Sequence, residues 1–253
     1  MTSPEPHVSV ITPTFGRPEM LPHLYNRFAA QGVENSELIV VDDSAQSCTF
    51  MEKLADPRVR YIHLPERRST GEKRNLAVEA ARGQIIVQFD DDDYYSPQYI
   101  RTMIECMTAQ DADFVKLSSF FLYSKIYQQY AYWETEKKSG THFVWGEDPA
   151  VTKIKSDRIV NIGDMHLGYG FSYVFKKKVW KATQFPHIFF GQDTPFIKAA
   201  ITNGFKICLV HDNTGICLHI LHGENVSRSF PQYIIPNGLM YRFFDGLNLA
   251  YLE

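Results

Sequence analysis

The stretch Ile85-Ile86-Val87-Gln88-Phe89-Asp90-Asp91-Asp92-Asp93 decides the fold and points to the site. Its apolar first half is typical of a buried strand, and it ends abruptly in four consecutive aspartates. Closely spaced carboxylates repel one another, and hard divalent cations such as Mg2+ and Mn2+ relieve this while bridging carboxylates to phosphates. The run therefore indicates a metal site for a phosphorylated ligand. The simpler alternative is a solvated acidic turn before a helix start at Ser96-Pro97.

Strand and helix signals alternate through the first part of the chain. We predict strands over residues 8–12, 38–41, 59–64 and 85–89, and helices over 19–31, 49–54, 71–81 and 98–109. Alternation of this kind predicts parallel βαβ units, and so an α/β fold with a mostly parallel sheet flanked by helices. The second half is less regular, with strands expected over 114–122, 171–175 and 205–210 and a helix over 194–202.

Polar clusters follow three of the four predicted strands. They are Thr12-Pro13-Thr14, Asp42-Asp43-Ser44 and Asp90–Asp93. Because the carboxyl ends of parallel strands share one edge of a sheet, we expect these clusters to converge there and form a binding site. The alternative is that polar residues simply begin the loops.

Composition excludes several classes of protein. The chain has 253 residues, a net charge of −3 and a pI of about 6.3, so no global basic field attracts nucleic acid or anionic lipid. Its four cysteines contain no C-x-x-C pair, which fits a reducing cytoplasm and disfavours structural zinc. No apolar stretch approaches ~20 residues. We expect a cytoplasmic protein without a transmembrane segment, with peripheral membrane contact as an alternative.

The order of the motifs resembles the family 2 glycosyltransferases, inverting enzymes of the GT-A fold that use nucleotide sugars. The resemblance is carried by residues 8–15, 37–44, 71–77 and 85–97, and beyond about residue 110 it thins to short islands. It implies a Rossmann-like single domain over residues 1–253. Within it, we expect a nucleotide-sugar-binding half over 8–110, a smaller acceptor-side half over 111–230 and a C-terminal helical segment over 231–253.

The resemblance assigns the donor base to the first two clusters. A carboxylate is a natural acceptor for the imide N–H of uracil, and the resemblance places this role on Asp42 or Asp43. Thr12, Pro13 and Thr14 are expected to form the backbone wall beside the base. Capping of a helix by one of the two aspartates is the structural alternative.

The donor phosphates and the metal are expected further along. Arg68, Lys73 and Arg74 are the candidates for the phosphates, although Arg74 could instead pair with the acidic run. In the D-x-D alignment Asp92 binds Mn2+ or Mg2+, and Asp90 contacts the ribose or a metal-bound water. Asp91 is a further donor-binding candidate, since the run permits a one-residue shift.

Two islands near the C-terminus complete the expected site. In Gly191-Gln192-Asp193 the resemblance makes Asp193 the general base, and Gln192 stands where family members often carry glutamate. The structural alternative is that Asp193 caps the following helix. In the segment 217–227, His222 is the preferred further metal ligand, and His219 is the second choice.

The leading prediction is a metal-dependent inverting glycosyltransferase that moves a sugar from a nucleotide donor, expected to be a UDP-sugar, to a hydroxyl acceptor. The acceptor can be a glycan, a lipid-linked glycan or another hydroxyl compound. A sugar nucleotidyltransferase is disfavoured because the loop 14–18 has one glycine. A non-catalytic nucleotide-sugar-binding protein is favoured only by Gln192. The aromatic residues of 123–133 and Trp145 are expected in the core or stacked on a substrate ring.

Overall fold

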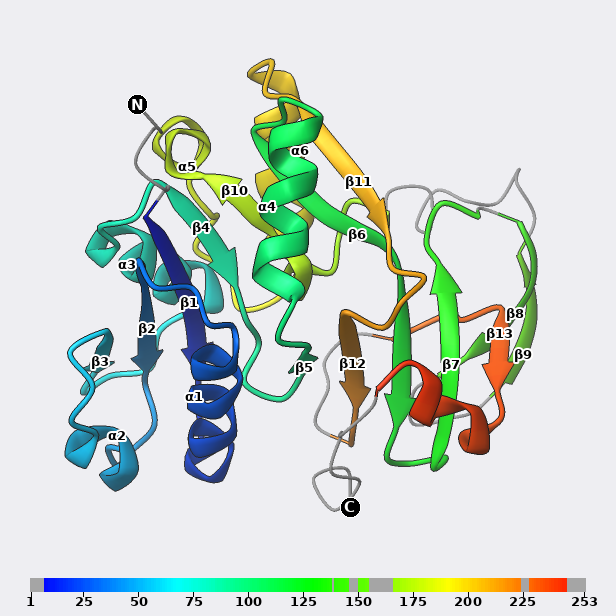
Figure 1. The fold of residues 1–253 in the computed structure, drawn as a ribbon, viewed down its shortest axis with the longest axis horizontal. Helices are drawn as coiled ribbons and strands as arrows, with labels where there is room; N and C mark the ends of the chain where they lie inside the picture. Colours follow the sequence, from blue (N-terminus) through cyan, green and yellow to red (C-terminus); the bar gives the residue numbers. More distant parts are fainter. Residues whose placement is uncertain (1–6, 138, 146–149, 155–165, 224–227, 245–253) are drawn as a thin grey trace. The chain divides into compact units, whose positions relative to one another are not determined.

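A computed structural model describes residues 7–137, 139–145, 150–154, 166–223 and 228–244 (Figure 1). The chain divides into two compact units, each assembled from three stretches. Unit 1 contains Met1–Asp92, Pro97–Lys116 and Leu167–Leu209, and unit 2 contains Asp93–Ser96, Leu117–His166 and Val210–Glu253. The single domain with sequential halves that we expect from the sequence stays a prediction.

Unit 1 is built on a parallel sheet. Its strands are β1 (Val8–Thr14), β2 (Ser36–Asp42), β3 (Val59–His63) and β4 (Ile85–Gln88), in the spatial order β4-β1-β2-β3. All four were expected from the sequence, with ends that differ by one or two residues. Strand β10 (Val174–Lys176) lies antiparallel to β4 and to the first residues of β6 (Phe114–Ser124).

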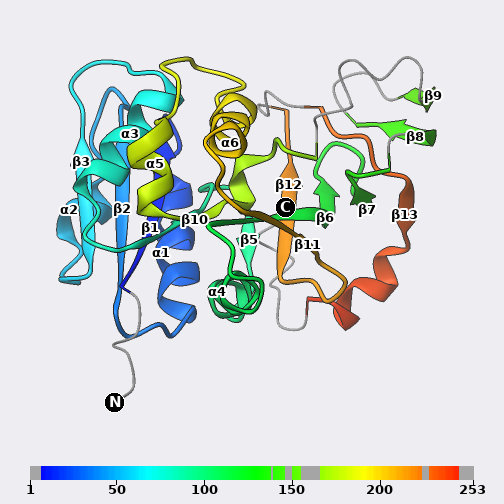
Figure 2. The ribbon, with the colours of Figure 1, turned by 90° about the horizontal axis from the view of Figure 1, so that it is seen from above.

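Helices cover both faces of this sheet (Figure 2). On one face, α3 (Thr70–Ala80), α5 (Lys177–Thr183) and α6 (Asp193–Thr202) pack into a core with Ile11, Ile39 and Ile86 of the strands. On the other face lie α1 (Leu21–Ala30) and α4 (Tyr99–Ala109), and α2 (Thr49–Lys53) follows β2. Short 3-10 turns, η1 (Pro18–Met20) and η3 (Gly170–Ser172), complete the unit.

The start of α3 is fixed by its own sequence. Ser69 accepts a hydrogen bond from the backbone N–H of Glu72, and the Glu72 carboxylate accepts one from the backbone N–H of Ser69. This capping box satisfies two N–H groups that a helix start otherwise leaves without partners. It sets the first turn of the helix, which carries the basic residues Lys73 and Arg74.

Unit 2 contains a mixed sheet and a separate hairpin. The sheet strands are β5 (Tyr94–Tyr95), β6 from residue 117 onward, β7 (Gln129–Glu134), β12 (Cys217–Leu221) and β13 (Tyr233–Ile235). Strand β12 lies parallel to β6 and antiparallel to β5. Strand β11 (Ile207–His211) also pairs with β6, and β8 (Gly140–Val144) and β9 (Ala150–Ile154) form the hairpin.

The C-terminal segment corrects one expectation. Instead of a helix beginning near residue 231, the chain forms strand β13 and then the short 3-10 turn η4 (Asn237–Arg242). Pro236 separates the two, because proline lacks the N–H that a continuing helix needs. Residues 245–253 of the expected helix lie outside the described residues. Over the described ranges, every helix is too short or too polar to cross a bilayer.

Candidate functional site

The carboxyl ends of β1, β2 and β4 meet at one edge of the unit 1 sheet. Thr14 lies beside Asp42 in the register of β1 and β2, and Ile11 lies beside Gln88 in that of β1 and β4. This pairing brings the polar residues that follow the three strands to the same edge. The expected convergence is therefore present within unit 1.

The two adjacent aspartates at the end of β2, Asp42 and Asp43, have different surroundings. Asp42 accepts hydrogen bonds from the backbone N–H of Ser44 at 2.8 Å and from the hydroxyl of Tyr61 at 2.7 Å. Asp43 instead accepts from cationic side chains: Lys73 Nζ lies 2.6 Å from Oδ1, and Arg67 Nη1 lies 2.7 Å from both oxygens. Asp42 thus stabilises its own turn, whereas Asp43 gathers positive charge at the sheet edge.

Lys73 and Arg68, the expected phosphate-binding residues, differ in how far their side chains are exposed to solvent. Lys73 is buried, and its ammonium group also donates to the carbonyl of Thr14 at 2.7 Å. Burial lowers the pKa of Lys73, while the nearby Asp43 acts in the opposite direction. The side chain of Arg68 is 48% exposed, and its backbone N–H donates to Asp43. Lys73 therefore uses its ammonium group in contacts within the protein, whereas the Arg68 guanidinium is exposed enough to contact a ligand.

Asp91 and Asp92 share one arginine. Nη2 of Arg17 lies 2.7 Å from Oδ1 of Asp91, and Nη1 of the same guanidinium pairs with Oδ2 of Asp92. The hydroxyl of Thr14 donates to the other oxygen of Asp91, and Arg27 donates to its backbone carbonyl at 3.1 Å. Burial and the neighbouring charge of Asp92 raise the pKa of Asp91 to about 6, against the opposing effects of Arg17 and Thr14.

A second arginine joins the first aspartate of the run to the expected base. Nη1 of Arg74 pairs with Oδ1 of Asp193, and Nη2 lies 3.5 Å from Oδ1 of Asp90. Burial alone lowers the pKa of Arg74, but the two carboxylates more than offset this and the pKa is raised. The backbone N–H of Gly170 donates to Oδ2 of Asp193 at 3.1 Å. Arg74 therefore pairs with the acidic run, the alternative that the sequence left open.

Asp193 does not cap the helix that it begins. Helix α6 starts at Asp193 itself, Gln192 takes the N-cap position, and no side-chain capping hydrogen bond is present. The Asp193 carboxylate turns instead toward Arg74 and Gly170. Gln192 is buried, and its Oε1 has no hydrogen-bond partner among the described residues. The capping alternative therefore does not account for the carboxylate of Asp193.

The acidic run has the donor set that a hard divalent cation requires. Asp90, Asp92 and Asp93 each offer a carboxylate oxygen, and these atoms lie within 4.8 Å of one another. All three ligands are oxygens, which suits Mg2+ or Mn2+ rather than a softer metal. The residues therefore fit the expected cation, and Asp92 is common to this group and to the ion pair with Arg17.

The two expected histidines lie in unit 2. Nδ1 of His219 is 2.9 Å from both carboxylate oxygens of Asp93, and the backbone N–H of Ile220 donates to Asp93 at 2.8 Å. His219 is thus oriented by a buried carboxylate. His222 follows the end of β12, and its role as a metal ligand stays a prediction.

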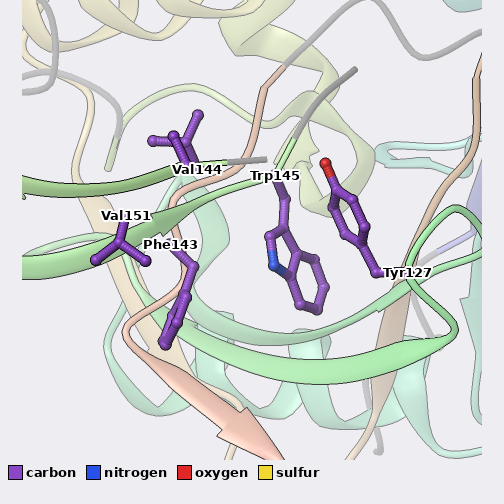
Figure 3. Close-up of a pocket in the computed structure, with 6 residues that line it drawn as sticks. Tyr127, Phe143, Val144, Trp145 and Val151 are labelled. Atoms are coloured by element: carbon purple, nitrogen blue, oxygen red, sulfur yellow. The ribbon is translucent and has the colours of Figure 1, made fainter. Parts of the chain in front are cut away.

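The aromatic residues of 123–133 and Trp145 lie partly in the core of unit 2 and partly in the wall of a pocket. Tyr130, Trp133 and Trp145 are buried, as expected for core residues. Tyr127 and Trp145 also line a cavity of about 250 Å3, their ring centroids 5.8 Å apart (Figure 3). Phe143, Val144, Ala150 and Val151 of the β8–β9 hairpin supply the rest of its wall.

Two arginines of the site were missed by the sequence analysis. Arg17 lies in a loop considered only for its single glycine, and Arg67 stands one residue before the expected Arg68. The guanidinium carbon of Arg67 lies 3.2 Å from the ring centroid of Phe15, in addition to its contact with Asp43. The sequence signal for both arginines was electrostatic, because adjacent carboxylates need cations nearby. The run Asp90–Asp93 is paired by Arg17, and the pair Asp42-Asp43 is approached by Arg67 through Asp43.

Known proteins share this sequence pattern. The glycosyltransferase GlyG of Streptococcus pneumoniae is 24% identical over 219 residues, which cover 81% of this chain and 68% of GlyG. The succinoglycan biosynthesis protein ExoO of Rhizobium meliloti is 33% identical over 109 residues, covering 42% of this chain and 31% of ExoO. The chain thus spans about two thirds of GlyG, and its match to ExoO covers a smaller part of both proteins.

Solved structures share the fold. TarS 1–349 of S. aureus in complex with UDP-GlcNAc superposes with a TM-score of 0.62 at 19% identity, over 86% of this chain and 59% of that one. The mannosyltransferase PcManGT of Pyrobaculum calidifontis, in complex with GDP-Man and Mn2+, gives 0.59 at 15% identity, over 86% and 57%. The expected GT-A-like sheet flanked by helices is confirmed.

The family assignment rests on the sequence match together with this fold. The family described as Glycosyl transferase family 2 matches residues 9–181, which include the ends of β1, β2 and β4 and the acidic run. The match extends well beyond residue 110, where the resemblance carried by the motifs thins to short islands. The expected class of glycosyltransferase is confirmed, because the chain belongs to glycosyl transferase family 2.

Proposed function

We propose that this protein is an inverting glycosyltransferase that transfers a sugar from a UDP-sugar to a hydroxyl acceptor, with Asp193 as general base and a divalent cation at Asp92. The observation that carries the proposal is the bridge made by Arg74, whose guanidinium pairs with both Asp193 and Asp90. One side chain thereby links the residue expected to activate the acceptor with the residue expected to contact the donor.

The donor would bind at the carboxyl edge of the unit 1 sheet. Both Asp42 and Asp43 already accept hydrogen bonds. Asp43 is preferred for the base because its partners Lys73 and Arg67 are cations, which also attract the negative charge of the donor, whereas Asp42 holds Ser44 and Tyr61 of the fold. The backbone of Thr12, Pro13 and Thr14 continues β1 to that edge. Arg68 would reach the diphosphate with its exposed guanidinium. The comparisons support a nucleotide sugar, since TarS was solved with UDP-GlcNAc and PcManGT with GDP-Man.

Asp92 would hold Mn2+ or Mg2+, with Asp90 and Asp93 of the same run offering further carboxylate oxygens. A cation bound there offsets the negative charge that develops on the leaving nucleoside diphosphate. The Mn2+ in the PcManGT complex supports this choice of metal.

Asp193 would accept the proton of the acceptor hydroxyl while its oxygen attacks the anomeric carbon. The bond from that carbon to the diphosphate breaks on the opposite side, and its electron pair leaves with the diphosphate. The Asp193 side chain is 19% exposed, so a hydroxyl can reach it from outside. Arg74 and the N–H of Gly170 orient the carboxylate for this transfer.

Transfer and donor hydrolysis across a panel of UDP-, GDP- and dTDP-sugars test this function. Asp92→Asn and Asp193→Asn should each lower activity by about 10²-fold or more, the size expected for a lost acid–base or electrostatic group. Asp56→Asn is the matched control, because Asp56 pairs with Arg58 and Tyr25 outside the site. Full activity in both site variants would overturn the assignment.

A non-catalytic nucleotide-sugar-binding protein is the second candidate. It is favoured by Gln192 beside the expected base and by the ion pair that occupies Asp193. Metal-dependent UDP binding by the unchanged protein, with no turnover of any donor in the panel, would select this candidate.

A further inference from the structure

Within unit 1, Arg17 and Arg74 pair with carboxylates of the acidic run, and their side chains differ in how deeply they are buried. Arg74 lies on helix α3 with its side chain 4% exposed, and it pairs with two carboxylates. Arg17 lies in the loop between β1 and η1, and its side chain is 25% exposed. Of the two, Arg17 is better placed to move, because leaving its partner does not open the core.

The loop that carries Arg17 is anchored on either side of it. Gly16 has a φ of +69°, a left-handed conformation that suits glycine, and its N–H donates to the hydroxyl of Ser44 at 2.7 Å. After Arg17, the N–H of Met20 donates to the Arg17 carbonyl at 3.1 Å. The backbone at residue 17 is therefore held while the long side chain can change its rotamer.

The two partners of Arg17 are held differently. Asp91 has no exposed side-chain surface, and it is fixed by Thr14 and Arg27 as well as by Arg17. Asp92 is 10% exposed and is one of the three carboxylates that could hold a cation. The Asp92 carboxylate therefore pairs with the Arg17 guanidinium and is also an expected ligand of the divalent cation, so the two cations compete for it.

We propose that Arg17 is a resident counter-cation of the acidic run, which releases Asp92 when a divalent cation binds there and then donates its freed N–H groups to the diphosphate of the donor. The second half of this inference rests on the proposed function. A divalent ion carries twice the charge of a guanidinium and prefers carboxylate oxygens. The released guanidinium would then be available to the phosphates of a bound donor, which its fork geometry suits.

The first test measures Mn2+ binding without nucleotide, by calorimetry and by the EPR signal of free Mn2+. Arg17→Gln should bind Mn2+ about tenfold more tightly than the unchanged protein, a difference equivalent to about 1.4 kcal/mol. Arg17→Lys keeps the positive charge but not the bidentate contact, so its Mn2+ affinity should lie between those of the unchanged protein and Arg17→Gln. Arg58→Gln is the control, since Arg58 pairs with Asp56 away from the run. Equal or weaker Mn2+ binding by Arg17→Gln, or no Mn2+ binding by any of these proteins, would overturn the proposal.

A melting experiment gives a second readout that a merely structural arginine would not change. Without metal, Arg17→Gln should melt several degrees lower than the unchanged protein, because Asp91 and Asp92 lose their counter-charge. Saturating Mn2+ should remove the part of this difference that is due to Asp92, because Asp92 and not Asp91 belongs to the group that could hold the cation. A loss in Tm of the same size with and without Mn2+ would contradict the exchange of cations.

UDP binding in saturating Mn2+ tests the second half. Arg17→Gln should bind UDP about tenfold more weakly, as expected for a lost charge-assisted contact to phosphate. Unchanged UDP affinity would overturn the diphosphate contact. Failure here remains distinct from failure of the proposed function, which is measured separately as donor turnover by the unchanged protein. If the unchanged protein turns over a donor but Arg17→Gln shows none of these effects, the proposed function stands and the proposed role of Arg17 is wrong.

Discussion

Gly170 lies directly against the carboxylate of Asp193. Its N–H donates to Oδ2 at 3.1 Å, and a Cβ atom on residue 170 would overlap Oδ1 and lie 2.8 Å from Oδ2. The carbonyl of Gly170 in turn accepts a hydrogen bond of 2.5 Å from the amide of the buried Gln88. Asp193 therefore depends on a glycine that is itself held by strand β4.

We expect Gly170→Ala to displace the Asp193 carboxylate and lower transfer by about 10²-fold, the size of effect that a 1 Å misplacement can have. The measurement is kcat and KM for the donor found in the panel, with nucleotide binding as a second readout. Nucleotide affinity should change little, because Asp193 is assigned to the acceptor step.

The matched control for this substitution is Gly238→Ala. A Cβ at residue 238 meets no atom within 4 Å, so this variant should keep full activity. Full activity in Gly170→Ala as well would show that Asp193 is not held where the proposed chemistry needs it.

Arg74→Gln should destabilise unit 1. Removing one partner of a buried ion pair leaves uncompensated charge, at a typical cost of about 3 kcal/mol or more. Urea denaturation measures the free energy of unfolding. Adding Asp193→Asn to the variant should recover part of the loss, since the orphaned carboxylate is then neutral.

The exposed pair of Arg58 and Asp56 gives the comparison for Arg74. Arg58 is 39% exposed, and Arg58→Gln should cost less than about 1 kcal/mol, as surface pairs usually do. A loss for Arg74→Gln as small as that for Arg58→Gln would contradict the view that Arg74 ties Asp90 to Asp193.

The sequence predicted those parts of the fold that leave a local signal. The strand Ile85–Gln88 begins with the apolar run Ile85-Ile86-Val87, and short segments rich in β-branched and apolar residues located all four parallel strands of unit 1. The segment 233–242 failed because its apolar spacing suited a helix, while Tyr233–Ile235 instead pairs with Tyr130–Tyr132 of β7. A partner strand some hundred residues away leaves no trace in the local periodicity.

The residues of the candidate site also fall into those that a local motif marks and those that it does not. Asp90, Asp92 and Asp193 were identified from motifs, and their position at strand ends and a helix start follows from the fold. Arg17 was missed because its partner Asp92 lies 75 residues away, and no motif marks a lone arginine in a loop. Long-range ion pairs depend on which side chains the finished fold brings together, and local patterns do not record this.

Glu37 makes the folded state sensitive to acid. Burial would raise its pKa, but hydrogen bonds from Ser9, Arg82 and His7 more than offset this and lower the pKa to about 2. A folded-state pKa below the unfolded value of 4.5 stabilises the protein above pH 4.5, and this stabilisation is lost as the pH falls toward 2. The difference amounts to about 3 kcal/mol.

The free energy of unfolding, measured by urea between pH 6 and pH 2, checks this dependence. Glu37→Gln should be less stable at pH 6 and should lose less stability on acidification than the unchanged protein. Parallel pH profiles for the two proteins would show that Glu37 does not carry this dependence.

Asp42 and Asp43 provide a matched pair that separates nucleotide binding from local stability. Asp42 holds Ser44 and Tyr61, so Asp42→Asn should lower Tm while leaving UDP affinity within about threefold, well under the 1.4 kcal/mol of a tenfold change. Asp43→Asn should weaken UDP binding about tenfold or more, because the acceptor for the base and the anchor of Arg67 and Lys73 are both altered. Calorimetry with UDP and Mn2+ measures the affinities, and a thermal melt accompanies each variant. If Asp42→Asn loses UDP and Asp43→Asn does not, the base is recognised by the other aspartate and the cationic cluster around Asp43 serves the fold alone.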